Sequence, residues 1–224
     1  MEELFDRELR KTLEQGMQTH YPYKTKLLKD DKTLLSGGVI IFSKWPIIKE
    51  SQIIYRAKTG WDALAAKGAV YALINKKGQN FNLIGTHLQA GNSSEGKKAR
   101  QNQLQELASF IALLNIPNNQ PFLIGGDFNI DASSPDINYL MATLNVNLIK
   151  NIGHPYSSDG TINSMHMGGD QVRIDYIFSS RNALAPKNEF NNIYILRALD
   201  DQKMWPNFDL SDHFPVAGFF DFRN

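Results

Sequence analysis

PFLIGGDFNID, residues 121–131, joins an apolar run to two glycines and then places Asp127 and Asn129 two positions apart. Side chains two apart in an extended chain share a side, so a carboxylate and a carboxamide are expected together where a strand ends. The glycines allow a turn and let a ligand approach the backbone closely. The stretch therefore predicts either part of a functional site or a plain Gly-Asp turn with a solvated asparagine.

Strand-like and helix-like segments alternate on both sides of this stretch. Strands are expected where β-branched and aromatic residues are bounded by Gly, Pro or Asn, namely at 37–42, 68–74, 80–86, 121–125, 172–178, 192–197 and 216–222. Helices are expected at 6–17, at 97–114 and after the Ser-Ser-Pro of 133–135. Many strands with few helices predict an α/β (α+β) class, with mixed sheets covered by helices in one domain.

Composition narrows the class of protein. The chain has 224 residues, of which 42% are hydrophobic, and this suits a globular core rather than disorder. A formal net charge of +1 gives no overall electrostatic reason to bind nucleic acid. The absence of cysteine excludes disulfides, thiolate zinc sites and a cysteine nucleophile. The longest apolar runs, such as 37–42, are too short to span a bilayer.

Three further segments carry groups suited to acid–base or metal chemistry. LSDHFPV sets Asp212 beside His213, and histidine is the usual base near neutral pH. IGTHLQA ends a strand with His87, which alone would more often be a structural hydrogen-bonding group. VRIDYIF places Asp175 opposite an apolar face, where either Arg173 or a histidine would be needed as its partner if it is buried.

These motifs together, GDFN, R-I-D-Y, S-D-H-x-P and an upstream T-H-L, resemble the endonuclease/exonuclease/phosphatase superfamily with its deoxyribonuclease I-like fold. SKWP at 43–46 and THLQA at 86–90 resemble the neutral sphingomyelinases, particularly the bacterial phospholipase-type enzymes. The likeness runs from Glu3 to about Phe220. It implies a four-layer sandwich of two mixed β-sheets flanked by helices, in a single catalytic domain over residues 1–224.

The resemblance also implies an activity. It is the hydrolysis of sphingomyelin or a related phospholipid to ceramide and phosphocholine, with Mg²⁺, or alternatively Mn²⁺, at a membrane surface. The candidate ligands include no cysteine, which favours these ions over zinc. A monomer without a stable nucleic-acid partner, secreted or membrane-associated, is implied. The alternatives are a nuclease or phosphatase of the same fold, and a truncated or inactive relative that only binds.

The matching motifs imply roles for the acidic and amide residues. Glu3, with Glu2 as the register alternative, matches a metal-ligating glutamate, and Asp212 matches a carboxylate on the metal side. Asp127 matches the aspartate that positions a metal or the nucleophilic water. Asn129 matches the asparagine that contacts the phosphoryl oxygens of the substrate.

The histidines and one lysine complete the implied site. His213 matches the general base, and Asp175 matches the carboxylate that orients a catalytic histidine. His87 matches the second histidine, although the residues leave open which of the two is base and which is acid. Lys67 stands where nuclease relatives have an acidic residue. It is expected to bind substrate phosphate as a point charge, with Asp62 as the nearby acid, or to be a solvated lysine at a strand end.

Membrane contact is expected from a short segment before the S-D-H motif. Its apolar residues, Met204, Trp205 and Phe208, would form either a small tip at the lipid interface or ordinary core packing. The candidates for an aromatic face against choline are Trp205, Trp61 and Tyr156. The resemblance further implies that the fold lacks its first strand and helix, so that Glu3 would lie almost at the raw end of the chain.

Overall fold

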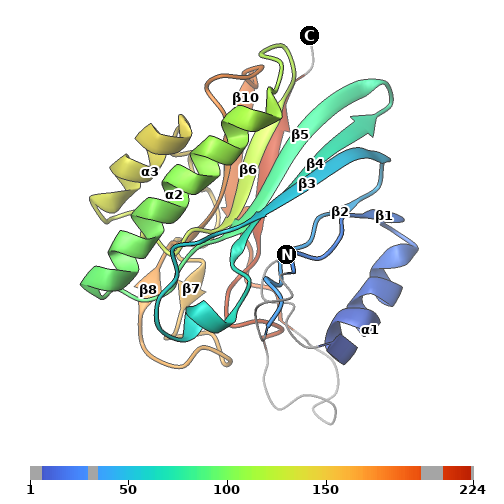
Figure 1. Cartoon of the computed structure of the whole chain (residues 1–224). Helices are drawn as coiled ribbons and strands as arrows, with labels where there is room; N and C mark the ends of the chain where they lie inside the picture. The colour runs from blue at the N-terminus through green and yellow to red at the C-terminus, as the bar shows by residue number, and fades with distance from the viewer. Residues whose placement is uncertain (1–6, 30–34, 198–208, 223–224) are drawn as a thin grey trace.

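The main sheet of the protein has five strands. The computed structural model describes residues 7–29, 35–197 and 209–222, and within them the strand order is β3–β4–β5–β6–β9 (Figure 1). The bounds of these strands are β3 Ile47–Ile54, β4 Gly68–Lys76, β5 Gln79–His87, β6 Phe122–Asp127 and β9 Asp175–Ser179. Only β5 and β6 are parallel, so the sheet is mixed.

Two helices, α2 (Ser94–Leu114) and α3 (Asp136–Leu144), cover one face of this sheet (Figure 1). Helix α2 is the crossover that returns the chain to the same end of the sheet, as a parallel pair requires. The hydroxyl of Ser93 caps α2 by accepting a hydrogen bond from the amide of Gly96 at 3.1 Å. Between helices and sheet lies the larger apolar core, which includes Leu104, Leu107, Phe110, Ile124, Leu140 and Phe178.

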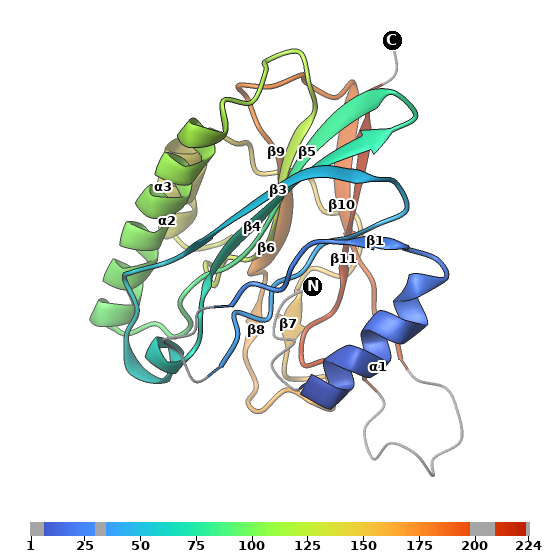
Figure 2. The ribbon, with the colours of Figure 1, turned by 45° about the vertical axis from the view of Figure 1, so that its right-hand side comes forward.

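The opposite face of the sheet carries a second sheet layer (Figure 2). There β10 (Asn188–Ile193) pairs antiparallel with β11 (Val216–Asp221), and α1 (Arg7–Gln18) lies outside them. The remaining elements are β1 (Tyr23–Lys24) paired with β2 (Phe42–Ser43), β7 (Ser158–Asp159) paired with β8 (Gln171–Val172), and a 3-10 turn at Gly60–Leu64. The order helix, sheet, sheet, helix confirms the predicted fold class, and in the described residues the second layer consists of antiparallel pairs.

Two predicted strands are interrupted. The one predicted at 37–42 is regular only at Phe42–Ser43, although its backbone still accepts hydrogen bonds at Val39 and Ile41. The one predicted at 172–178 breaks at residues 173 and 174, whose carbonyls accept from the loop that follows β6. Side-chain pattern alone does not reveal such breaks, because they arise from contacts with distant loops.

One strand was missed by the sequence analysis, and another was predicted at the wrong position. Strand β3 was missed because Lys49, Glu50 and Gln52 interrupt its apolar pattern, as is common at a sheet edge. The strand predicted at 192–197 is β10 at Asn188–Ile193, four residues earlier at its start. The apolar run beyond Ile193 is exposed rather than paired in a sheet.

Gly126, the residue before Asp127, has no room for a side chain. Its φ is 142°, and a Cβ there would lie 1.9 Å from the carbonyl oxygen of Thr86. We expect Gly126→Ala to lower the free energy of unfolding by about 3 kcal/mol or more, since β6 must move away from β5. Gly78→Ala is the matched control, because Gly78 also has positive φ but nothing within 4 Å. Equal losses in thermal denaturation would contradict this explanation.

Candidate catalytic site

Three neighbouring strands of the main sheet place ionisable side chains in one row. His87, the last residue of β5, is the register partner of Asp127, the last residue of β6. Asp127 is in turn the partner of Asp175, the first residue of β9. Because β5 and β6 run in the same direction and β9 runs oppositely, these three ends meet at one edge of the sheet. The structure therefore brings together three residues singled out from separate motifs.

His213 reaches the row from the loop that precedes β11. Its Nδ1 lies 2.9 Å from Oδ2 of Asp175. The loop is anchored by buried Phe214, whose amide donates to the carbonyl of Ser157 at 2.7 Å. The hydroxyl of Ser157 accepts from the amide of Asp175 at 3.1 Å. Of the two partners considered for Asp175, the histidine is therefore the one found, and Arg173 is not.

Asn129 forms a turn with Asp127 that is built into the site rather than solvated. Its φ is 51°, in the left-handed region that asparagine tolerates. Its backbone amide donates to Oδ1 of Asp127 at 2.7 Å, and its side-chain Nδ2 donates to Oδ2 at 3.0 Å. Nδ2 also donates to the carbonyl of Leu88 at 3.1 Å. Asn129 therefore orients the Asp127 carboxylate here, and its predicted contact with phosphoryl oxygens stays a prediction.

The donor set of the row suits a hard divalent cation. Asp127, Asp175 and His213 each offer one ligand atom, and these atoms lie within 4.8 Å of one another. Burial raises the pKa of Asp127 well above its ordinary value, and the charge of Asp175 raises it further. Two close carboxylates with an imidazole are better satisfied by a cation, and oxygen ligands fit Mg²⁺. The residues present therefore fit the predicted metal.

The two other predicted metal ligands are not placed in this group. Asp212 is half-buried next to His213, and its Oδ1 accepts the hydroxyl of Ser211 at 3.4 Å. Among the residues that the structure describes, the metal-ligand group does not include it. Glu3 lies outside the described residues. Both assignments stay predictions.

Lys67 is buried, with 2% of its surface exposed, so the interpretation as a solvated lysine was wrong. Its Nζ lies 2.9 Å from Nε2 of His87, 2.8 Å from the carbonyl oxygen of Leu88 and 3.0 Å from Oδ2 of Asp62. Asp62 is thus the nearby acid, as expected, and it also accepts the amide of Ala90 at 2.7 Å. The ammonium is occupied by protein groups, which argues against the predicted direct contact with substrate phosphate.

The two histidines have opposite electrostatic environments. Burial lowers the pKa of His87 well below its ordinary value, and the nearby charges of Lys67 and His213 lower it further. Burial also acts to lower the pKa of His213, but the hydrogen bond and charge of Asp175 outweigh it and raise the pKa to about 10. Without a bound cation, the site therefore pairs a neutral histidine with a charged one.

Ser157, which joins the two halves of the site, could not be predicted from any sequence motif. It is a buried serine in a loop, and its contacts with Asp175 and Phe214 are long-range. The aromatic candidates are scattered: Trp61 is 88% exposed, and Tyr156 lines a separate pocket described below. Met204, Trp205 and Phe208 lie outside the described residues, so the expected lipid-facing tip stays a prediction.

A family model for the endonuclease/exonuclease/phosphatase family matches residues 3–213, which include every residue of the row and His213. The chain belongs to this family. The match confirms the superfamily predicted from GDFN, R-I-D-Y and S-D-H.

Individual relatives narrow the likeness to sphingomyelinases. The chain is 34% identical to a sphingomyelinase C of Leptospira interrogans over 97% of its own length and 43% of the relative. It is 31% identical to a phospholipase C of Staphylococcus aureus, covering 97% of this chain and 74% of that protein. It therefore spans about two fifths of the Leptospira relative's length. These relatives confirm the resemblance to the neutral sphingomyelinases.

A solved structure supports the fold and the choice of metal. A beta toxin variant of Staphylococcus aureus, crystallised with bound magnesium ions, superposes with a TM-score of 0.91 at 28% identity. The match covers 98% of this chain and 84% of that protein. A relative of the same fold therefore binds the ion that the donor set here would accept.

Proposed function

We propose that the protein is a Mg²⁺-dependent phosphodiesterase that hydrolyses sphingomyelin or a related phospholipid to ceramide and phosphocholine by in-line attack of water. The observation that carries the proposal is the row His87, Asp127 and Asp175 with His213 against it. It combines a histidine–carboxylate pair with a ligand group for a hard cation. The likeness to sphingomyelinases supports the choice of substrate.

In this proposal the chain supplies positioning and proton transfer. A cation held by the ligand group that contains Asp127 would offset the negative charge of the phosphoryl oxygens. Asp175 accepts the Nδ1 proton of His213, which leaves Nε2 as the basic nitrogen that takes a proton from water. His87, neutral and fixed by Lys67, stabilises the leaving oxygen by hydrogen bonding. Asn129 keeps the Asp127 carboxylate oriented.

The proposed place of action is a membrane surface, and the proposed location is outside the cell or at a membrane. None of the helices described is both long and apolar enough to cross a bilayer. In this proposal the protein meets its phospholipid substrate from the aqueous side, as a monomer without a stable nucleic-acid partner.

The test compares two phosphodiester substrates under one set of conditions. Sphingomyelin vesicles and plasmid DNA are each incubated with the protein and Mg²⁺, and phosphocholine release and strand breaks are measured. We expect phosphocholine release without strand breaks, and its loss on adding EDTA with recovery on excess Mg²⁺. Strand cleavage without lipid turnover would instead indicate a nuclease, and activity that survives EDTA would exclude the metal.

A further inference from the structure

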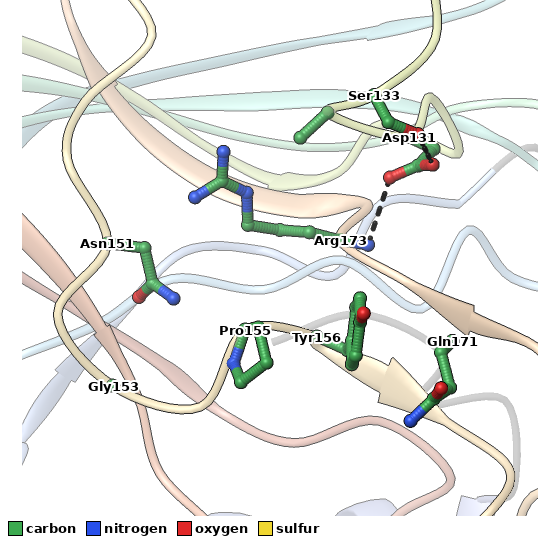
Figure 3. A pocket seen from close by; sticks show the side chains of 9 residues that line it. Asp131, Ser133, Asn151, Gly153, Pro155, Tyr156, Gln171 and Arg173 are labelled. Atoms are coloured by element: carbon green, nitrogen blue, oxygen red, sulfur yellow. Dashed lines mark hydrogen bonds between the residues drawn. The ribbon is translucent and has the colours of Figure 1, made fainter.

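A pocket of about 470 Å³ lies next to the catalytic row and has no role in the reaction described above. Its walls come from three short segments, at 131–133, 151–156 and 171–173 (Figure 3). The first follows Asp127 by four residues, and the last ends two residues before Asp175. Two of the three segments therefore adjoin the strand ends that carry the catalytic carboxylates.

Hydrogen bonds hold the pocket rigidly against the catalytic row. The amide of Ala132 donates to the carbonyl of Arg173 at 3.0 Å, which joins two walls of the pocket. Ser157, next to the pocket residue Tyr156, accepts from the amide of Asp175 at 3.1 Å. A substrate with its phosphate at the row would thus have its neighbouring atoms beside a preformed surface.

Arg173 supplies the cationic group of this pocket. Its backbone amide donates to Oδ1 of Asp131 at 3.3 Å, while its side chain extends into the pocket (Figure 3). Asp131 is further engaged by the hydroxyl of Ser133. Across the described ranges no carboxylate pairs with the guanidinium, whose Cζ lies 5.8 Å from the ring centroid of Tyr176. A planar fork of donors therefore faces the space that a substrate would fill.

We propose that this pocket holds the amide-bearing backbone of the ceramide part of the substrate, and that Arg173 donates hydrogen bonds to its acceptor oxygens. The inference rests on the proposed function. It makes Arg173 a specificity-determining residue, because a site built to hydrogen-bond a group discriminates strongly against analogues that lack it.

The positive charge of Arg173 also argues against choline as the group that occupies this pocket. A quaternary ammonium can stack on an aromatic ring such as Tyr156, which lines this pocket. It would, however, lie near the guanidinium of Arg173, and like charges in one pocket repel each other. Asp131 adds a carboxylate to the same pocket, but its oxygens accept from the Arg173 amide and the Ser133 hydroxyl. The guanidinium is therefore the charged group left facing the substrate, and its donors favour the neutral, acceptor-rich side of the phosphodiester over the head group.

The experiment compares two substrates that share phosphocholine and an apolar chain. Sphingomyelin has an amide and a hydroxyl next to the phosphate, whereas hexadecylphosphocholine has neither. Both are presented in the same detergent micelles with Mg²⁺, and phosphocholine release gives kcat/KM. We expect Arg173→Met to lower kcat/KM for sphingomyelin by about 10- to 100-fold, and to leave that for hexadecylphosphocholine within about twofold.

The control is Arg181→Met, at the far end of β9, where the guanidinium binds Asn147 on the surface. This variant should leave kcat/KM unchanged for both substrates. An equal loss on both substrates in Arg173→Met would mean that the pocket serves choline or the fold, and it would overturn the inference, as would no loss on either. No turnover of either substrate by the unmodified protein would refute the proposed function itself, and the inference with it.

Discussion

Replacing His213 with alanine is expected to reduce phosphocholine release by about 10³-fold, the range typical for loss of a general base. His213 is the residue that joins the loop before β11 to the catalytic row, through its 2.9 Å contact with Asp175. Its removal takes one member from the ligand group but leaves the carboxylates of Asp127 and Asp175 to hold the cation, and it leaves water without a proton acceptor. Initial rates on sphingomyelin at saturating Mg²⁺ measure the effect.

The chain offers a matched control for this variant in a second histidine–aspartate pair. Nε2 of His154 lies 2.9 Å from Oδ2 of Asp159, the same separation as in the catalytic pair. His154→Gln keeps a hydrogen-bonding group there and should retain activity within about threefold. If His213→Ala retained activity to the same extent, His213 would not be the base. Asp175→Asn, which preserves shape but removes the charge that orients His213, should fall between the two.

The residues of the row were predictable from the sequence because each stands at the end of a strand. Strand ends of one sheet meet at an edge, so His87 and Asp127 had to be close once β5 and β6 were neighbours. The turn at Asn129 follows from the local chemistry of Gly and Asn. The fold class could be predicted from the alternation of strand-like and helix-like segments along the chain, and the motifs indicated the family.

What could not be predicted depends on contacts between distant loops. Asp175 and His213 are 38 residues apart, and sequence periodicity does not say whether Arg173 or a histidine is the partner. Ser157 belongs to no recognised motif. Its role is visible only in the structure, where its loop contacts Asp175 and Phe214. The membrane expectation falls on residues 198–208, which lie outside the described part of the chain.

Lys67 shows why a matched position does not fix a role. A lysine at a strand end is compatible with solvent, with substrate phosphate and with a buried partner, and only burial distinguishes the three. The structure places its ammonium among His87, Leu88 and Asp62, so we expect it to act through His87. By donating to Nε2, the ammonium fixes the imidazole orientation and places the His87 proton on Nδ1.

Lys67→Met is accordingly expected to lower kcat by about 10²-fold while KM changes by less than about threefold, since a positioning residue affects the transition state more than substrate binding. It should also lower the free energy of unfolding by about 2 kcal/mol, because buried acceptors lose their donor. Steady-state kinetics and thermal denaturation measure the two effects. Lys58→Met is the control, because Lys58 donates to the carbonyl of Ala65 without contacting a histidine.

The direction of the kinetic change decides between the two roles of Lys67. A lysine that binds substrate phosphate would raise KM, and the loss would be relieved at high substrate concentration. A lysine that positions His87 would leave the defect at saturation. Asp62→Asn should then give a smaller loss of the same kind, because Asp62 holds the ammonium in place through its 3.0 Å contact with Nζ of Lys67. A rise in KM with kcat unchanged in both variants would restore the substrate-binding role that the sequence predicted.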